Sequence, residues 1–375
     1  LWYNGMDTKY TDALSLIQSE IIERESLQEA YENLARLSPS LVRMQAKGLV
    51  RNVPEIIKLN KQLEEKEAKF VRKILENSDV IRFKESHAKF NPASNEDLHV
   101  FFKWVGVKEL KSVDEEALLE VDHPVAKLIL DKRGESKLRS TYVAPLLDRG
   151  KHVCSDGKVH PSTSQSVTVT TRTNSSDPNI QNFPRRDRKE IRRVIGVPPL
   201  HKFVAMDYGQ LEARVVAMLT KDPVLVAETW NGDDIHGVWT DKLGKRFLPK
   251  KLAEPGGRKL IRDGVKNLWT FPQFFRSQLH SVAVDLSNRF KVEISERDLR
   301  PFSDEFWDKY KRVLQWQDEV IESYWVNGYV ETAHGFRRHE PMNENEIVNL
   351  PIQGTAAQIV LDAQYRIDRM AYEMD

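Results

Sequence analysis

The sequence has a single cysteine, Cys154, in 375 residues. One thiol excludes an intrachain disulfide and any zinc site that needs several thiolates. The sequence also lacks a run of about 20 apolar residues, which a membrane-spanning helix requires. Its first residues do not show the basic region followed by an apolar region that is typical of a secretion signal. These absences predict a protein of the cytoplasm with no membrane partner.

The sequence has almost no excess of charge of either sign. Lysine and arginine number 57, aspartate and glutamate number 56, and the formal net charge is +1. The total charge therefore neither indicates nor excludes a nucleic-acid partner, although the run RRDRKEIRR, residues 185–193, is locally basic. A composition of 40% hydrophobic and 30% charged residues is typical of a globular protein, and the length allows two or three domains.

Apolar residues at helical spacing dominate the chain. Residues 12–78 predict two or three long helices, interrupted near Ser38 and at Asn52, with Pro54 in a first helical turn. Ser94, three residues before Asp97, predicts a helix N-cap. The other predicted helices begin at Pro124 or span residues 210–217, 258–271, 278–290 and 303–325.

Strand signals are few. Val167 and Val169 alternate with threonines, which favours a strand or hairpin, and the stretch NGYVETAHG, residues 327–335, has the chemistry of a hairpin. We find no internal repeat. The predicted fold class is α+β with helix in excess.

One carboxylate stands in an unusual place. Asp207 follows a short apolar run, residues 203–206, which is typical of a strand covered on both faces. A carboxylate at the end of such a strand is suited to a hard divalent cation such as Mg²⁺. Taken alone, the residue favours a plainer interpretation, an N-cap for the next helix, whose apolar stripe includes Leu211 and Val215.

A second segment places cations on one face of a predicted helix. Residues that recur every four positions share a slowly drifting stripe, and here they are Arg258, Arg262, Lys266, Thr270 and Phe274. Cations followed by an aromatic ring suit a triphosphate followed by a base. A solvated charged face is the general alternative, but it does not explain the continuation into Thr270 and Phe274. Pro272 would collide with the carbonyl of Leu268 in a straight helix, so we expect a kink or an early end.

These two segments resemble motifs of the DNA polymerase I family, family A. DYGQLEARV, residues 207–215, resembles motif A, and RDGVKNLWTFPQFF, residues 262–275, resembles motif B of the fingers helix. Supporting blocks occur in the family's order: RMQAKGLV, FNPASNEDL, HPVAKLILDKRGESKLRSTYVAPLL, TRTNSSDPNIQNFPRR, DIHG, GYVETAHGFRR and NLPIQGTAAQIV. The resemblance covers nearly the whole chain, and KNLWTFPQFF is most similar to a bacteriophage branch.

The resemblance implies a right-hand fold of thumb, fingers and a palm with an antiparallel sheet. The implied parts are a remnant of a 3′ to 5′ exonuclease domain (1–30), the thumb and palm entry (31–145), the palm with motif A (146–220), the fingers with motif B (221–308) and further palm (309–375). It also implies template-directed DNA synthesis: transfer of deoxynucleotides to a primer 3′-hydroxyl by a two-metal mechanism. The implied enzyme is a DNA-directed DNA polymerase, a nucleotidyltransferase of DNA replication.

The resemblance also assigns roles at the reacting centre. Asp207 would bind two Mg²⁺ ions, for which Mn²⁺ is an alternative, with help from the carbonyl of Tyr208. Glu212 would lie under the incoming sugar and exclude a 2′-hydroxyl. Lys266 would give a proton to the leaving pyrophosphate, with Arg262 beside it. The implied nucleotide-binding residues are Tyr208, Gln210, His236, Arg262, Lys266, Thr270 and Phe274. Apart from the family, His236 would be taken for a structural histidine and Glu212 for a surface residue.

Other implied residues contact primer-template DNA. They are Arg172, Asn179, Gln181, Asn182, Asn349 and Gln353, with Lys137, Ser140 and Thr141 on the backbone at the base of the thumb. Tyr3 and Asp7, in YNGMD, resemble the last exonuclease motif. The implied partners are primer-template DNA and deoxynucleoside triphosphates, and a processivity factor or other replication protein is a further candidate.

The sequence departs from the family pattern at several places. Gly209, Leu211 and Ala213 differ conservatively in motif A; Thr270 stands where Phe or Tyr is usual, and Phe274 where Tyr is usual. The motif C strand, with its His-Asp pair, would follow the last helix, so we expect an internal fragment of a longer polymerase that is impaired alone. The alternatives are a catalytically silent, polymerase-shaped DNA-binding protein or subunit, and a purely structural helical protein, which leaves the basic stripe unexplained.

Overall fold

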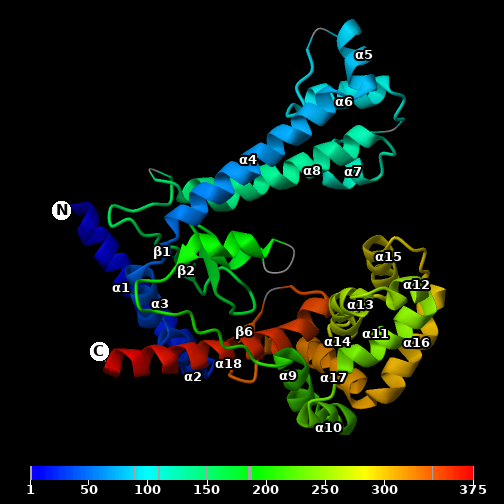
Figure 1. Ribbon diagram of the computed structural model, residues 1–375. Coiled ribbons are helices and arrows are strands. Elements are labelled where there is room, and N and C mark those ends of the chain that lie inside the picture. Colours follow the sequence, from blue (N-terminus) through cyan, green and yellow to red (C-terminus); the bar gives the residue numbers. More distant parts are fainter. Residues whose placement is uncertain are drawn as a thin grey trace. The chain divides into compact units, whose positions relative to one another are not determined.

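The computed structural model describes residues 2–87, 89–108, 110–148, 150–184, 188–339 and 341–374. It divides into two compact units, each described here by itself: the first comprises residues 1–42, 165–173 and 206–375, and the second comprises residues 43–164 and 174–205. Helices predominate, and the strands are two or three residues long (Figure 1). The predicted helix-rich α+β class is therefore confirmed. Residues 185–187 of the basic run lie outside the described residues.

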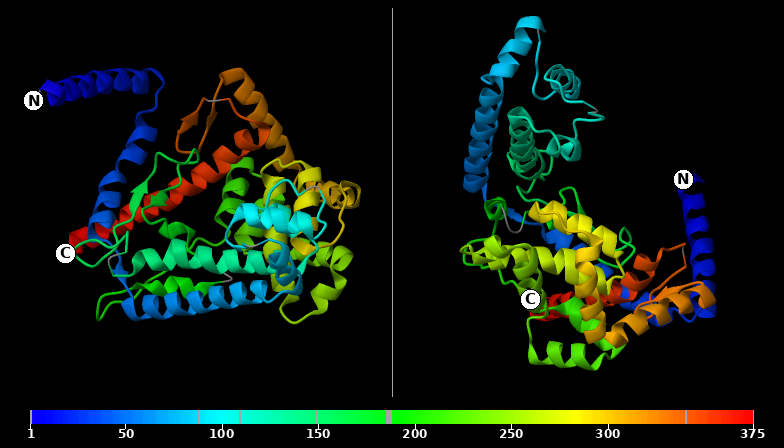
Figure 2. Two further views of the ribbon diagram at one scale, coloured as in Figure 1. Left: turned by 90° about the horizontal axis from the view of Figure 1, so that it is seen from above. Right: turned by 90° about the vertical axis from the view of Figure 1, so that its right-hand side faces the viewer.

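A pair of long helices forms the body of the second unit. α4 (Val53–Leu75) and α8 (Pro124–Leu138) lie side by side over most of their length (Figures 1 and 2). Asn52 caps α4 by accepting a hydrogen bond from the Glu55 amide, and Pro54 occupies the first turn, as predicted. The remaining elements of this unit are β1 (Val50–Arg51), α5 (Ser78–Ser86), α6 (Asn95–Trp104), α7 (Glu115–Leu119), a π-turn (Arg139–Val143), 3₁₀ turns at Ala144–Leu146, Ile180–Asn182 and Lys189–Val194, β2 (Ser162–Ser164), β3 (Asn174–Ser176) and β4 (Ile195–Gly196).

The far end of the α4 and α8 pair carries its own apolar core. Phe83, Phe101 and Phe102 are buried there with aliphatic side chains of α4 and α8. Ser94 begins α6 by accepting a hydrogen bond from the Asp97 amide at 3.2 Å. The predicted N-cap is therefore confirmed.

The described residues of this unit form two strand pairs, and both are antiparallel: β1 with β4 and β2 with β3. The hairpin predicted in this stretch is confirmed, because β2 and β3 pair antiparallel within residues 161–176. A strand at Val167 and Val169 themselves is wrong, because residues 165–173 form the irregular connection between β2 and β3. Both valines are exposed there. Period-two alternation predicts a strand only where a partner strand accepts the backbone hydrogen bonds.

The first unit is built around a cluster of aromatic side chains. Trp239, Trp269, Phe274, Phe306 and Tyr310 are all fully buried, and Phe306 contacts the other four rings. The helices of this unit are α1 (Trp2–Arg24), α2 (Gln28–Ala35), α3 (Ser38–Lys47, which crosses the unit boundary), α9 (Leu211–Thr220), α10 (Pro223–Asn231), α11 (Ile235–Phe247), α12 (Pro249–Ala253), α13 (Gly257–Val265), a π-turn (Lys266–Thr270), α14 (Phe271–Phe274), α15 (Leu279–Phe290), α16 (Glu296–Lys309), α17 (Lys311–Asn327) and α18 (Glu344–Met374).

The predicted hairpin is confirmed in this unit. β5 (Val330–Glu331) pairs antiparallel with β6 (Arg337–Arg338), and Gly335 takes a φ of +80° in the turn between them. Only glycine adopts this backbone region readily. None of the described helices is long and apolar enough to cross a membrane.

The strand predicted at residues 203–206 is wrong. This segment is extended but pairs with none of the described residues, and its side chains are exposed: Phe203 by 66%, Val204 by 80% and Met206 by 71%. A buried strand needs neighbours on both edges to take up its backbone groups, and an apolar run cannot supply them by itself. Asp207 therefore lies in an exposed coil rather than at the end of a strand.

Candidate functional site

The basic helix is interrupted at its last cation, Lys266. α13 ends at Val265, and Lys266–Thr270 form a π-turn in which the Phe271 amide donates to the Lys266 carbonyl. Pro272 lies in the first turn of the short helix α14, which ends at Phe274. A π-turn holds one residue more than an α-turn, and it separates Pro272 from the straight helical course that its ring would obstruct. The predicted break is confirmed.

This extra residue changes which side chains continue the cationic face. Thr270 and Phe274 have no exposed surface, and Phe274 belongs to the aromatic core. The predicted placement of both on the face of Lys266 is therefore wrong. Lys266 Nζ lies instead 5.3 Å from the ring centroid of Phe271, which stacks on Phe275 at 5.7 Å with an interplanar angle of 14°.

The other two cations of the stripe form paired hydrogen bonds with carboxylates of the α11 segment. Arg262 Nε and Nη2 donate to the two oxygens of Asp234 at 3.0 and 2.6 Å. Arg258 does the same to Asp241 at 2.8 and 2.9 Å. Hydrogen bonds from each arginine hold the pKa of its carboxylate below the usual range. In the part of the chain described, Lys266 alone of the three cations has no carboxylate partner.

His236 lies in the first turn of α11 and is buried, with 2% of its surface exposed. Its ring meets the Phe271 ring edge-on at 5.4 Å between centroids, and Nδ1 has no hydrogen-bond partner among the described residues. Burial, with the charges of Lys266 and Arg262, lowers its pKa from 6.5 to about 4. His236 is therefore neutral at pH 7 and lies next to the two cations, as a member of a nucleotide-binding site would.

The start of α9 carries two further predicted site residues. Gln210 adopts a left-handed φ of +54° ahead of the helix and donates from Nε2 to the Asp233 carbonyl at 3.1 Å. This bond joins α9 to the segment that leads into α11. Glu212, in the first turn, accepts a hydrogen bond from Arg172 Nη2 at 2.6 Å. Arg172, which is predicted to contact DNA, and Glu212, which is predicted to lie under the incoming sugar, thus form an ion pair with each other.

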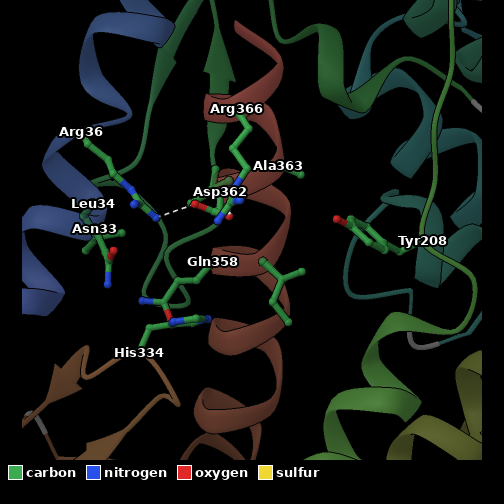
Figure 3. A pocket seen from close by; sticks show the side chains of 11 residues that line it. Asn33, Leu34, Arg36, Tyr208, His334, Gln358, Asp362, Ala363 and Arg366 are labelled. Atoms are coloured by element: carbon green, nitrogen blue, oxygen red, sulfur yellow. Dashed lines mark hydrogen bonds and ion pairs between the residues drawn. The ribbon is translucent and has the colours of Figure 1, made fainter. Parts of the chain in front are cut away.

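Asp207 is exposed, and it does not cap α9, because no side chain among the described residues caps the start of that helix. Its neighbour Tyr208 lines a pocket of about 430 Å³ whose other walls include α18 (Figure 3). Gln358 is buried in this wall, and both polar atoms of its amide lack partners in the described structure. Among the described residues, no three His, Cys, Asp or Glu side chains form a group that could hold a metal ion. Asp207 therefore belongs to no such group within the described residues.

The residues predicted to contact DNA occur in both units. In the first unit, Asn349 and Gln353 lie on α18, partly buried, and the Asn349 side-chain oxygen has no partner within the described ranges. Tyr3 and Asp7 are exposed on α1. In the second unit, the Asn179 side chain caps a 3₁₀ turn by accepting a hydrogen bond from the Asn182 amide. The other residues of this unit that are predicted to contact DNA are exposed: Gln181, Asn182, Lys137, Ser140 and Thr141.

Sequence reasoning missed three residues that lie beside the predicted site residues Arg262 and Lys266. In a continuous α-helix, Phe271 and Phe275 would not share the face of Lys266, so the four-residue spacing did not select them. Only Pro272 indicated that the helix would break and that the register of the following residues would change. Asp234, two residues before His236, was overlooked because a single Asp ahead of a helix is typical of a cap.

Comparison with known proteins identifies the family. Residues 60–375 match the model of DNA polymerase family A. DNA polymerase I, thermostable, of Thermus aquaticus is 29% identical over 93% of this chain and 42% of its own length. DNA polymerase I of Chloroflexus aurantiacus is 28% identical over 99% of this chain and 40% of its own length. The chain thus spans less than half the length of these relatives.

A solved structure supports the same fold. The POL domain of Pol1 from M. smegmatis, in complex with DNA primer-template and dNTP, superimposes with a TM-score of 0.70 at 22% identity, over 91% of this chain and 60% of that one. The family match covers far more than half of the chain. The chain belongs to DNA polymerase family A.

Proposed function

We propose that this chain is the nucleotide-binding and primer-binding part of a DNA-directed DNA polymerase, which transfers deoxynucleotides to a primer 3′-hydroxyl on a template. The observation that carries the proposal is the convergence of Arg262, Lys266, His236 and Phe271 in the first unit. Two cations, a neutral imidazole and a ring stacked on its neighbour suit a triphosphate joined to a planar base. Membership of the polymerase family supports the same reaction.

In this proposal Lys266 and Arg262 bind phosphate oxygens, and Lys266 protonates the leaving pyrophosphate. His236 adds a neutral ring N–H, while Phe271 and Phe275 replace Thr270 and Phe274 beside the base and sugar, because the π-turn moves them to the face of Lys266. Gln210 links the start of α9 to the segment that leads into α11, the helix that carries His236.

Divalent metal would act at Asp207. The carboxylate is exposed and the adjoining Tyr208 carbonyl is the second proposed ligand, as a hard cation prefers oxygen. Two-metal transfer requires at least one more carboxylate, and the described residues place none in a metal-binding group with it. When bound, Mg²⁺ would activate the primer hydroxyl and stabilise charge on the transferred phosphate.

The proposal is tested by primer extension with the full-length protein. Asp207→Ala should abolish extension in Mg²⁺ or Mn²⁺ and leave binding of duplex DNA intact, because the change removes a metal ligand rather than a DNA contact. Asp285→Ala, an exposed carboxylate on α15, is the matched control and should extend normally. Extension by the Asp207→Ala protein would remove the assigned role. A wild-type protein that binds DNA but never extends it would support the alternative, a silent polymerase-shaped DNA-binding protein.

Glu212 is proposed to exclude the 2′-hydroxyl of ribonucleotides. Glu212→Ala should raise ribonucleotide incorporation relative to deoxynucleotide incorporation. Arg172→Ala, which frees the Glu212 carboxylate from its ion pair, should weaken primer binding and leave sugar selection largely unchanged. An unchanged sugar ratio in Glu212→Ala would exclude the proposed role.

The proposed partners are primer-template DNA and deoxynucleoside triphosphates, which the M. smegmatis structure contains. The other proposed DNA contacts are Asn179, Gln181, Asn182, Lys137, Ser140, Thr141, Asn349 and Gln353. Binding of primer-template should weaken steeply with salt, because phosphate contacts release counterions. A processivity factor, a cytoplasmic setting, a phage origin and an exonuclease role for Tyr3 and Asp7 are further parts of the proposal.

A further inference from the structure

Asp234 forms hydrogen bonds with only one edge of the Arg262 guanidinium. Asp234 accepts hydrogen bonds from Nε and Nη2, while Nη1 has no acceptor among the described residues. A guanidinium has five N–H donors, and this arrangement leaves the donors of Nη1 available for a second acceptor. The pair is half-exposed, so it is accessible to a ligand from solution.

Gly237 provides the space for this arrangement. A Cβ atom built on Gly237 would lie 2.8 Å from Asp234 Cγ and closer still to one carboxylate oxygen. Any other side chain would therefore displace the carboxylate from the position in which it meets Arg262. The backbone of Gly237 is helical and needs no glycine for its own conformation, so the space that glycine leaves here is taken up chiefly by the Asp234 carboxylate, with Arg258 Nη2 next at 3.2 Å from such a Cβ.

We propose that Asp234 is a positioning residue for nucleotide binding: it orients Arg262 so that the free edge of the guanidinium meets the triphosphate, and Gly237 makes this orientation attainable. The inference rests on the proposed nucleotide site and adds Asp234 to it. The negative charge of Asp234 repels the triphosphate, whereas its hydrogen bonds to Arg262 orient the guanidinium and favour binding. These two effects have opposite signs, which makes them separable by experiment.

The test measures the affinity of the wild-type chain and its variants for a deoxynucleoside triphosphate with Mg²⁺, by equilibrium dialysis. Asp234→Asn should bind about fivefold more weakly, the size expected when a half-exposed ion pair no longer fixes its arginine. Gly237→Ala keeps both charges and should show a similar loss, while its melting temperature stays equal or rises because alanine favours a helix. In an Arg262→Ala background, Gly237→Ala should have no further effect, and Asp234→Asn should no longer weaken binding, because only the repulsion between the carboxylate and the triphosphate is then removed.

Asp241→Asn is the matched control. It breaks the equivalent pair of hydrogen bonds between α11 and α13, the Arg258 to Asp241 pair, and should leave triphosphate affinity within about twofold. If Asp234→Asn or Gly237→Ala binds as tightly as wild type or more tightly, the positioning role is overturned. If the wild-type chain binds no triphosphate, the proposed function fails as well. If the wild-type chain binds triphosphate and the variants bind it equally well, only the positioning role of Asp234 fails.

Discussion

Acid should destabilise the first unit through His236. The imidazole is buried beside two cations, and its pKa in the folded protein is lowered from 6.5 to about 4. Below pH 6.5 the unfolded chain therefore binds a proton that the folded chain excludes, so stability falls as the pH falls from 6.5 to 4 and levels off below. A difference of 2.5 pKa units corresponds to about 3 kcal/mol, of which about 2 kcal/mol is lost at pH 5.

The measurement is urea unfolding at several pH values, followed by tryptophan fluorescence, because Trp239 and Trp269 are buried in the same aromatic core. His236→Gln removes the titrating group and keeps a polar side chain of similar size. The wild-type free energy of unfolding, minus that of His236→Gln, should fall by about 2 kcal/mol between pH 7 and pH 5. A constant difference across this range would refute the proposed burial of a neutral imidazole.

Lys266 offers an internal check, because its charge contributes to the low pKa of His236. Lys266→Met should raise that pKa toward its ordinary value, since one repelling cation is removed. The pH window of instability should then become narrower. Titration of the His236 ring protons by NMR reports the pKa directly in both proteins.

Two further outcomes test the fold. Phe274→Ala should cost about 3 to 5 kcal/mol of stability because it empties a buried site, whereas Phe271→Ala should lower triphosphate affinity with a smaller loss of stability; equal effects in melting and binding assays would contradict the π-turn register. Ser94→Ala should cost about 1 kcal/mol in urea unfolding by removing the cap of α6, and an unchanged midpoint would show that the cap contributes nothing.

Local signals predicted the local structure well. Pro54 with Asn52, Ser94 with Asp97, and the glycine of the hairpin turn each fix a boundary through their own backbone or side-chain hydrogen bonds. Such interactions lie within a few residues along the chain, so the sequence contains all their components. Pro272 likewise predicted a break in the basic helix, which the structure confirms.

The partners of these local elements depended on the whole fold. The run at 203–206 has the composition of a buried strand, but a strand exists only when another segment takes up its hydrogen bonds. The site shows the same division. The sequence named Arg262, Lys266 and His236, because charge and motif order are visible in it. Only the tertiary structure decided that Asp234 pairs with Arg262 and that a π-turn brings Phe271 to Lys266, because one extra residue in a turn rotates everything that follows.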